Sequence, residues 1–189
     1  MIMHIGGPKG VGKTTIANQL TERCPQYTIL TVSDELGRLS ERQFGKKWSF
    51  LDDQQKRGAR TDLCSEIVKM SGVVILDSHY IDLLNGKPIS VFPEELAASV
   101  DIFAVMVCTP EAILQRRILD GRTRTLSLDE IVKETEAERK AAYNLATHNG
   151  HARFWQIENR QAADTILEIQ TFLYGKGENN EGILRHRER

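Results

Sequence analysis

The sequence carries almost no net charge, because its 25 basic and 26 acidic side chains nearly cancel to give −1. A chain of this kind has no broad positive field to hold a long polyanion, which argues against a dedicated nucleic-acid-binding protein. It also lacks any apolar run long enough to cross a bilayer, so we expect no membrane association. With 40% hydrophobic and 27% charged residues, its composition is that of a soluble domain.

Cysteine is scarce, and its spacing excludes two further classes of protein. Cys24, Cys64 and Cys108 lie far apart and form neither a CxxC pair nor a Cys/His ligand set. We therefore expect small buried side chains in a reducing compartment, not a disulfide framework or a zinc site. Residues 1–5 run directly into a glycine-rich loop, so they predict a strand and not a signal peptide, and hence a cytoplasmic protein.

Short apolar runs alternate with helical patterns along the chain. Strands are predicted at residues 2–5, 27–32, 73–76, 102–107 and 154–157. Helices are predicted at about 12–23, over most of 35–72, from Thr109 to Gly121, from Ser127 to Asn149, and at 162–173. This order predicts an α/β fold with a parallel sheet, helices on both faces, and a ligand site outside the carboxyl ends of the strands.

The most specific motif is G-x-x-x-x-G-K-[ST], which residues 7–14 match in full between a predicted strand and a predicted helix. Glycines let the backbone wrap closely around phosphate oxygens, and the positive end of the following helix favours their charge. Lys13 is expected to reach the β- and γ-phosphates, and Thr14 to bind Mg²⁺. The motif therefore predicts an ATP site formed by Gly7, Lys9, Gly10, Val11, Gly12, Lys13, Thr14 and Thr15.

Two other nucleotide-binding classes are excluded. The chain has no Asn-Lys-x-Asp, which a GTPase needs to recognise guanine, and Lys13-Thr14 has no counterpart in the dinucleotide-binding fingerprint. Asp77 ends the apolar run 73–76, and an acidic residue at that place holds the metal in phosphoryl-transfer sites, although an aspartate after a strand is commonly a cap. Given the phosphate motif, we favour the metal role for Asp77.

Several arginines surround the break between two predicted helices, at positions 116, 117, 122 and 124. Guanidinium groups can stabilise the charge that spreads over a phosphoryl group in transfer, whereas a solvated charged face is the ordinary alternative. Gly121 supplies a hinge beside Arg122 and Arg124, which favours the catalytic role for those two. Arg116 and Arg117 are adjacent on one helix, so at most one can point to the site.

These motifs resemble the short, archaeal-type adenylate kinases among the P-loop nucleoside monophosphate kinases. The likeness covers residues 1–170 and is best from 73 to 159, in Val74-Ile75-Leu76-Asp77-Ser78-His79, Ile113-Leu114-Gln115-Arg116-Arg117 and Glu138-Arg139-Lys140-Ala141-Ala142-Tyr143. It implies a three-layer P-loop fold with sheet order 2-3-1-4-5. From Gly175 on, the composition shifts to Gly, Asn, Glu and Arg, so we expect one domain of residues 1–175 followed by a mobile tail, 176–189.

The resemblance also implies the functional parts. A helical arm, residues 35–72, would bind the acceptor, and a short lid, 118–128, would close over it. The phosphoryl group would be clamped by Arg116, Arg122 and Arg124, and Asn159 and Arg160 would border the adenine of ATP. The implied acceptor-binding residues are Ser33, Asp34 and Arg38. His79, two residues beyond Asp77 on the same edge of the sheet, is a further candidate for contact with the acceptor, although a lone histidine is more often structural.

Two departures leave the acceptor open: Lys9 stands where the family has a proline, and the arm matches poorly. The favoured hypothesis is a kinase that uses MgATP to phosphorylate a nucleoside monophosphate, AMP first. The alternatives are a kinase with another small-molecule or polynucleotide acceptor, and an ATPase that switches a partner's binding. The sequence is compatible with a homo-oligomer.

Overall fold

Five parallel strands form the central sheet of the computed structural model, which describes residues 1–84, 86–121 and 126–175. They are β1 (Ile2–Gly6), β2 (Tyr27–Thr31), β3 (Val73–Asp77), β6 (Ile102–Val107) and β7 (Arg153–Glu158). The strands lie in the order β2-β3-β1-β6-β7. The predicted α/β fold with a parallel sheet and helices on both faces is confirmed.

The strand order differs in its numbering from the predicted 2-3-1-4-5, because two strands that we did not predict precede β6. They are β4 (Ile81–Leu84) and β5 (Lys87–Ser90), which form a separate antiparallel hairpin, and a short helix α4 (Glu94–Ala97) follows them. Each strand has four residues, and only Ile81 is buried. Asp82 interrupts the apolar residues of β4, and β5 has the sequence Lys-Pro-Ile-Ser, so neither shows the continuous apolar run that marks a strand within a sheet.

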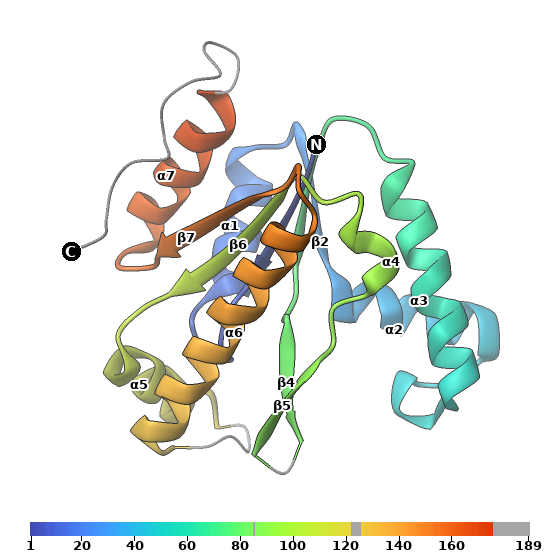
Figure 1. Ribbon diagram of the computed structural model, residues 1–189, viewed down its shortest axis with the longest axis horizontal. Coiled ribbons are helices and arrows are strands. Elements are labelled where there is room, and N and C mark those ends of the chain that lie inside the picture. Colours follow the sequence, from blue (N-terminus) through green and yellow to red (C-terminus); the bar gives the residue numbers. More distant parts are fainter. Residues whose placement is uncertain (85, 122–125, 176–189) are drawn as a thin grey trace.

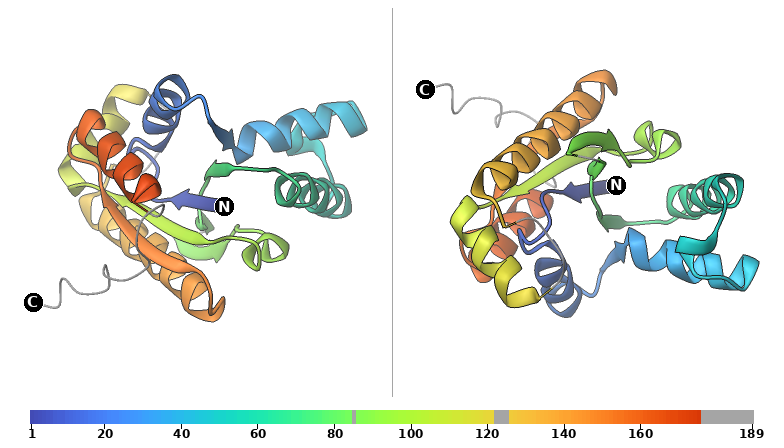
Figure 2. Two further views of the ribbon diagram at one scale, coloured as in Figure 1. Left: turned by 90° about the horizontal axis from the view of Figure 1, so that it is seen from above. Right: turned by 90° about the horizontal axis from the view of Figure 1, so that it is seen from below.

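Helices cover both faces of the sheet (Figure 1). Their bounds are Lys13–Arg23 for α1, Val32–Phe44 for α2, Asp53–Val68 for α3, Pro110–Asp120 for α5, Leu128–His148 for α6 and Ala162–Tyr174 for α7. A 3₁₀ turn, η1 (Trp48–Phe50), links α2 to α3. Seen from above and from below, α2 and α3 project sideways beyond the sheet (Figure 2). These two helices lie largely in the segment predicted to form a helical arm. No helix in the described part of the chain is long and apolar enough to span a membrane.

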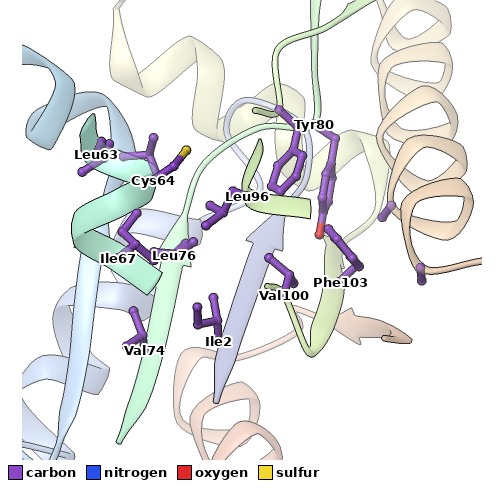
Figure 3. Close-up of a cluster of buried hydrophobic side chains, with 14 of the residues drawn as sticks. Ile2, Leu63, Cys64, Ile67, Val74, Leu76, Tyr80, Leu96, Val100 and Phe103 are labelled. Carbon is purple, nitrogen blue, oxygen red and sulfur yellow. The ribbon is translucent and has the colours of Figure 1, made fainter. Parts of the chain in front are cut away.

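Side chains alternate between two cores, one on each face of the sheet, as the period of a strand requires. Met3, Ile75 and Met106 face α1 and α7, whereas Val74, Leu76 and Phe103 face α3, α4 and α6. Figure 3 shows part of the second core, where Leu63 and Ile67 of the arm pack towards the strands. The arm is therefore anchored to the sheet by the buried face of α3.

Helix termini agree with the predicted caps. Thr109 Oγ1 accepts a hydrogen bond from Ala112 N, with Pro110 as the first helical residue, and Gly121 ends α5 in the left-handed conformation. Ser127 Oγ accepts from Glu130 N at the start of α6. These caps satisfy backbone groups that the helix itself leaves free, which fixes where both helices begin.

His4 is a buried imidazole in the second core. It packs edge-on against the rings of Tyr80 and Phe92, with ring centroids 4.4 and 4.8 Å away. Neither ring nitrogen has a hydrogen-bond partner in the described part of the chain. Burial lowers the pKa of His4 from 6.5 to about 3, and electrostatic interactions with His79 and Lys13 contribute in the same direction. His4 is therefore neutral in the folded protein at physiological pH.

This histidine should make stability depend on pH. Below pH 6.5 the unfolded chain binds a proton that the folded state takes up only near pH 3, so the free energy of unfolding falls as the pH drops. We predict that wild type loses about 1.4 kcal/mol more than His4→Leu between pH 7.5 and 5.5. Urea denaturation of both proteins at the two pH values measures this, and equal losses would contradict it.

Candidate functional site

The glycine-rich loop between β1 and α1 packs too closely for any side chain at its ends. Gly7 and Gly12 have φ angles of 139° and 103°, which side chains disfavour. A Cβ at Gly7 would lie 2.4 Å from Met106 O, and one at Gly12 would lie 2.6 Å from Asn159 Nδ2. Glycine at both positions therefore allows the loop to lie against β6 and the turn after β7.

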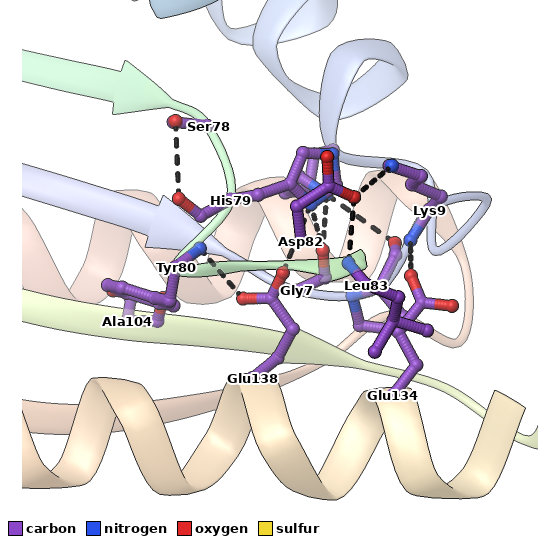
Figure 4. Close-up of polar contacts among 12 residues, drawn as sticks. Gly7, Lys9, Ser78, His79, Tyr80, Asp82, Leu83, Ala104, Glu134 and Glu138 are labelled. Carbon is purple, nitrogen blue, oxygen red and sulfur yellow. Dashed lines mark hydrogen bonds and ion pairs between the residues drawn. The ribbon is translucent and has the colours of Figure 1, made fainter. Parts of the chain in front are cut away.

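The outer side of the loop is held by a buried ion pair. Arg117 Nε donates to Lys9 O at 2.8 Å, and Arg117 Nη2 lies 2.6 Å from Glu134 Oε2. The other oxygen of Glu134 accepts from Lys9 N at 2.9 Å. The Arg117 and Glu134 side chains are 1% and 7% exposed, so α5 and α6 together fix the backbone of Lys9 from within the protein (Figure 4). Arg117 thus supports this side of the loop. Since Arg116 donates to the loop as well, at Val11 O, the prediction that at most one of the two arginines can point to the site is wrong.

Arg116 lies on the other side of the loop, beside Asn159. Both side chains donate to Val11 O, each at 2.6 Å. They line a pocket of about 550 Å³ between the start of α5 and the end of β7, together with Cys108, Thr109, Glu158 and Arg160. Arg160 is exposed and forms an ion pair with Glu158 at the mouth of this pocket. The predicted residues Arg116, Asn159 and Arg160 are therefore brought together.

Lys13, Thr14 and Asp77 meet where β1 and β3 end. The buried Lys13 donates from Nζ to Gly7 O at 2.6 Å, and Thr14 Oγ1 donates to Asp77 Oδ2 at 3.0 Å. Burial raises the pKa of Asp77, while Lys13 and the Thr14 hydrogen bond oppose this increase. A hydroxyl and a carboxylate are the hard oxygen ligands that Mg²⁺ takes, usually only one or two per site, so the pair fits that ion. Thr15 is exposed in the first turn of α1.

His79 lies beside the loop on a buried carboxylate. Its Nδ1 is 2.8 Å from Gly7 O and 3.1 Å from Glu138 Oε1, and Glu138 Oε2 accepts from Tyr80 N at 3.0 Å (Figure 4). The predicted acceptor residues Ser33 and Asp34 occupy the first turn of α2, and Asp34 lies near enough to Asp77 to help raise its pKa.

Two predicted side chains are directed elsewhere. Lys9 Nζ pairs with Asp82 of the β4–β5 hairpin at 2.8 Å, and Arg38 is exposed and pairs with Glu35 on its own helix at 2.6 Å. Lys9 and Asp82 border a pocket of about 620 Å³ between the hairpin and the first turns of α6. Arg122 and Arg124 lie outside the described residues, as does the tail 176–189.

Sequence analysis missed Glu134 and Glu138, which hold the loop and His79 from α6. A signal was present, because the buried residues of this helix are Ile131, Glu134, Glu138, Ala142 and Ala146. Their spacing of three and four marks one helix face, so two glutamates stand on an otherwise apolar stripe. A charged residue on such a face is costly to bury without a partner, which makes it a candidate for a specific role.

Comparisons with known proteins agree with this geometry. A family model described as AAA domain matches residues 6–135. The adenylate kinase of Pyrobaculum aerophilum is 27% identical over 148 residues, covering 72% of this chain and 74% of that protein. Among solved structures, the Bacillus subtilis YorR protein in complex with phosphorylated GDP covers 96% of this chain and 100% of its own, with a TM-score of 0.61 and 14% identity. Shikimate kinase from Acinetobacter baumannii in complex with shikimate covers 93% of each chain, with a TM-score of 0.55 and 20% identity.

The buried ion pair makes a testable prediction. Arg117→Met should lower the free energy of unfolding by about 3–5 kcal/mol, because it leaves the buried Glu134 without its cation. The double variant Arg117→Met/Glu134→Gln removes that unpaired charge and should be more stable than the single variant. Urea denaturation at pH 7 compares them; a loss below about 1 kcal/mol in the single variant would contradict the role of this pair.

Proposed function

Because the chain belongs to the AAA domain family and is a P-loop phosphotransferase, we propose that it transfers the γ-phosphoryl group of ATP to a nucleoside monophosphate, with AMP as the acceptor. One observation carries this proposal: Lys13, Thr14 and Asp77 converge at the carboxyl ends of the strands, with the Thr14 hydroxyl 3.0 Å from the Asp77 carboxylate. This is the arrangement that phosphate loops use to hold a nucleoside triphosphate with its metal ion.

ATP is proposed to bind across the loop. Its base would enter the pocket of about 550 Å³ that Asn159 and Arg160 border, and its phosphates would lie on the backbone N–H groups of Gly12 and of the first turn of α1. The N–H groups of Lys9 and Val11 already donate within the protein. Lys13 would exchange its contact with Gly7 O for the phosphate oxygens, which carry more charge. Thr14 and Asp77 would hold Mg²⁺, which neutralises developing phosphate charge when bound.

Arginine side chains are proposed to stabilise the transferred group. Arg116 already lies against the loop, with its guanidinium on Val11 O. Arg122 and Arg124, in the segment that we propose as a lid (residues 118–128), would join it when both substrates are bound. Stabilisation of this kind acts where charge develops in the transition state and so raises the rate more than the affinity.

The acceptor is proposed to bind between the arm and the end of β3. Ser33, Asp34 and Arg38 on α2 and His79 after β3 would contact it, and Arg38 would leave Glu35 to do so. The similarity to an adenylate kinase favours AMP, while 27% identity leaves room for another acceptor. A reducing, cytoplasmic setting is proposed as well, since the described cysteines are free thiols.

Two alternatives remain distinct from this proposal. A kinase acting on another small molecule or on a polynucleotide would share the ATP half of the site and differ in the arm. An ATPase that switches a partner's binding would need no acceptor. Incubation of the protein with MgATP and a panel of nucleoside monophosphates tests the proposal, because conversion of AMP to ADP above the ATPase background selects the proposed function. ATP hydrolysis that no monophosphate alters would refute it and leave both alternatives, of which the switch forms no phosphorylated product from any acceptor.

Lys13 is the strongest single test of the ATP half. Lys13→Ala should reduce turnover about a hundredfold or more, because one preorganised cation is lost from a site where water is partly excluded. Lys140→Ala, which removes an exposed lysine of α6, serves as the matched control and should turn over like wild type. Circular dichroism establishes that both variants are folded. Normal turnover of a folded Lys13→Ala protein would refute the assignment of the loop.

A further inference from the structure

Glu138 is a fully buried carboxylate within reach of the proposed acceptor site. Its side chain is 0% exposed on the inner face of α6. Burying an ionised carboxylate costs several kcal/mol unless hydrogen-bond donors satisfy it. The donors are Tyr80 N, 3.0 Å from Oε2, and His79 Nδ1, 3.1 Å from Oε1. Both belong to the segment that follows Asp77, so this carboxylate holds the residues directly after the proposed metal ligand.

The surroundings of His79 determine which ring nitrogen carries the hydrogen. Nδ1 faces two acceptors, Gly7 O at 2.8 Å and Glu138 Oε1 at 3.1 Å, so it must be a donor. Lys13 Nζ also lies 3.5 Å from Nδ1. An Nδ1 that carries hydrogen cannot accept from the lysine, so this approach is a contact between two donors and not a hydrogen bond.

The second ring nitrogen, Nε2, is left for a ligand. It has no hydrogen-bond partner in the described part of the chain, and the His79 side chain is 30% exposed. A ring held at Nδ1 by two oxygens can neither flip nor exchange tautomers without losing those hydrogen bonds. The direction of Nε2 is therefore set by Glu138 and by the first residue of the phosphate loop (Figure 4).

We propose that Glu138 is a positioning residue: its buried carboxylate keeps the hydrogen of His79 on Nδ1 and so presents Nε2 to the phosphoryl acceptor. This inference rests on the proposed function only for the identity of the ligand that meets Nε2. Carboxylates that hold the far nitrogen of a functional imidazole act in this way elsewhere, by fixing the tautomer and the ring orientation.

Glu138→Gln is the informative substitution, because it keeps the size of the side chain and changes only its hydrogen bonding. Tyr80 N can only donate, so the amide oxygen of glutamine must face it. The amide NH₂ then faces His79 Nδ1, and two donors meet. Gly7 O, 2.8 Å away, still accepts from Nδ1, so the hydrogen should move to Nε2 in only part of the population.

Nitrogen-15 NMR of histidine-labelled protein at pH 8 measures which ring nitrogen of His79 carries the hydrogen, with His79→Gln used to assign the signal. We expect wild-type Nδ1 to carry the hydrogen, and we expect that atom to carry a clearly smaller share of it in Glu138→Gln. A wild-type His79 without hydrogen on Nδ1 would overturn the proposal, whether or not the variant folds. An unchanged Nδ1–H in folded Glu138→Gln would overturn it too. This measurement needs no acceptor, so its failure is distinct from failure of the proposed kinase reaction.

Kinetics with the acceptor that the nucleotide panel identifies supply the second test. We expect Glu138→Gln to lower kcat about 10- to 100-fold with little change in the KM for ATP. The double variant with His79→Gln should be no slower than His79→Gln alone, because Glu138 acts through that ring. Glu136→Gln, on the exposed side of the same helix, is the matched control. Independent, multiplying losses in the double variant would show a merely structural role and refute the proposal.

Discussion

The phosphate loop can bind an anion only if its backbone N–H groups point inwards, and the protein fixes that backbone from outside. Lys9 is held at both its N–H and its carbonyl by Glu134 and Arg117, while Val11 O receives hydrogen bonds from Arg116 and Asn159. Each of these hydrogen bonds holds a carbonyl or an N–H group of the loop in its outward direction, and so keeps the backbone of the loop from rotating. Preorganisation of this kind spares the loop a rearrangement when charge arrives. The rest of the site is arranged around this fixed element.

Helix α6 is the second wall of the site. Glu134 and Glu138 lie four residues apart on its buried face, so one glutamate reaches the loop and the next reaches His79. Two buried carboxylates on a stripe that otherwise packs apolar side chains do not favour stability unless each has its donors. The free-energy cost of burying these carboxylates is understandable if both serve the site. Helix α6 would then position the proposed ATP half through Lys9 and the proposed acceptor half through His79.

The regular parts of this architecture could be predicted because their signals are local. Strand β1 precedes the loop directly, and Thr109, Gly121 and Ser127 mark helix ends through hydrogen bonds within a few residues. The β4–β5 hairpin could not, since its exposed strands have no apolar pattern. In the site, the motif predicted Lys13 and Thr14, and the end of β3 predicted Asp77; the three side chains lie close together, and their roles stay predictions. The roles of the adjacent residues Arg116 and Arg117 could be distinguished only in the structure, where Arg117 faces Glu134, 17 residues further along the chain. Lys9 was predicted to bind ATP. Its amine pairs with Asp82 of the hairpin, and the hairpin itself was not predicted from the sequence.

In the proposed function, one chain holds two nucleotides end to end across the loop. A compound that joins two adenosines through five phosphates spans both halves and tests this directly by isothermal titration calorimetry with Mg²⁺. We predict one molecule bound per chain, at least about tenfold more tightly than ATP, which is 1.4 kcal/mol or more in binding free energy. Binding no tighter than that of ATP would contradict it, because the second adenosine would then have no site.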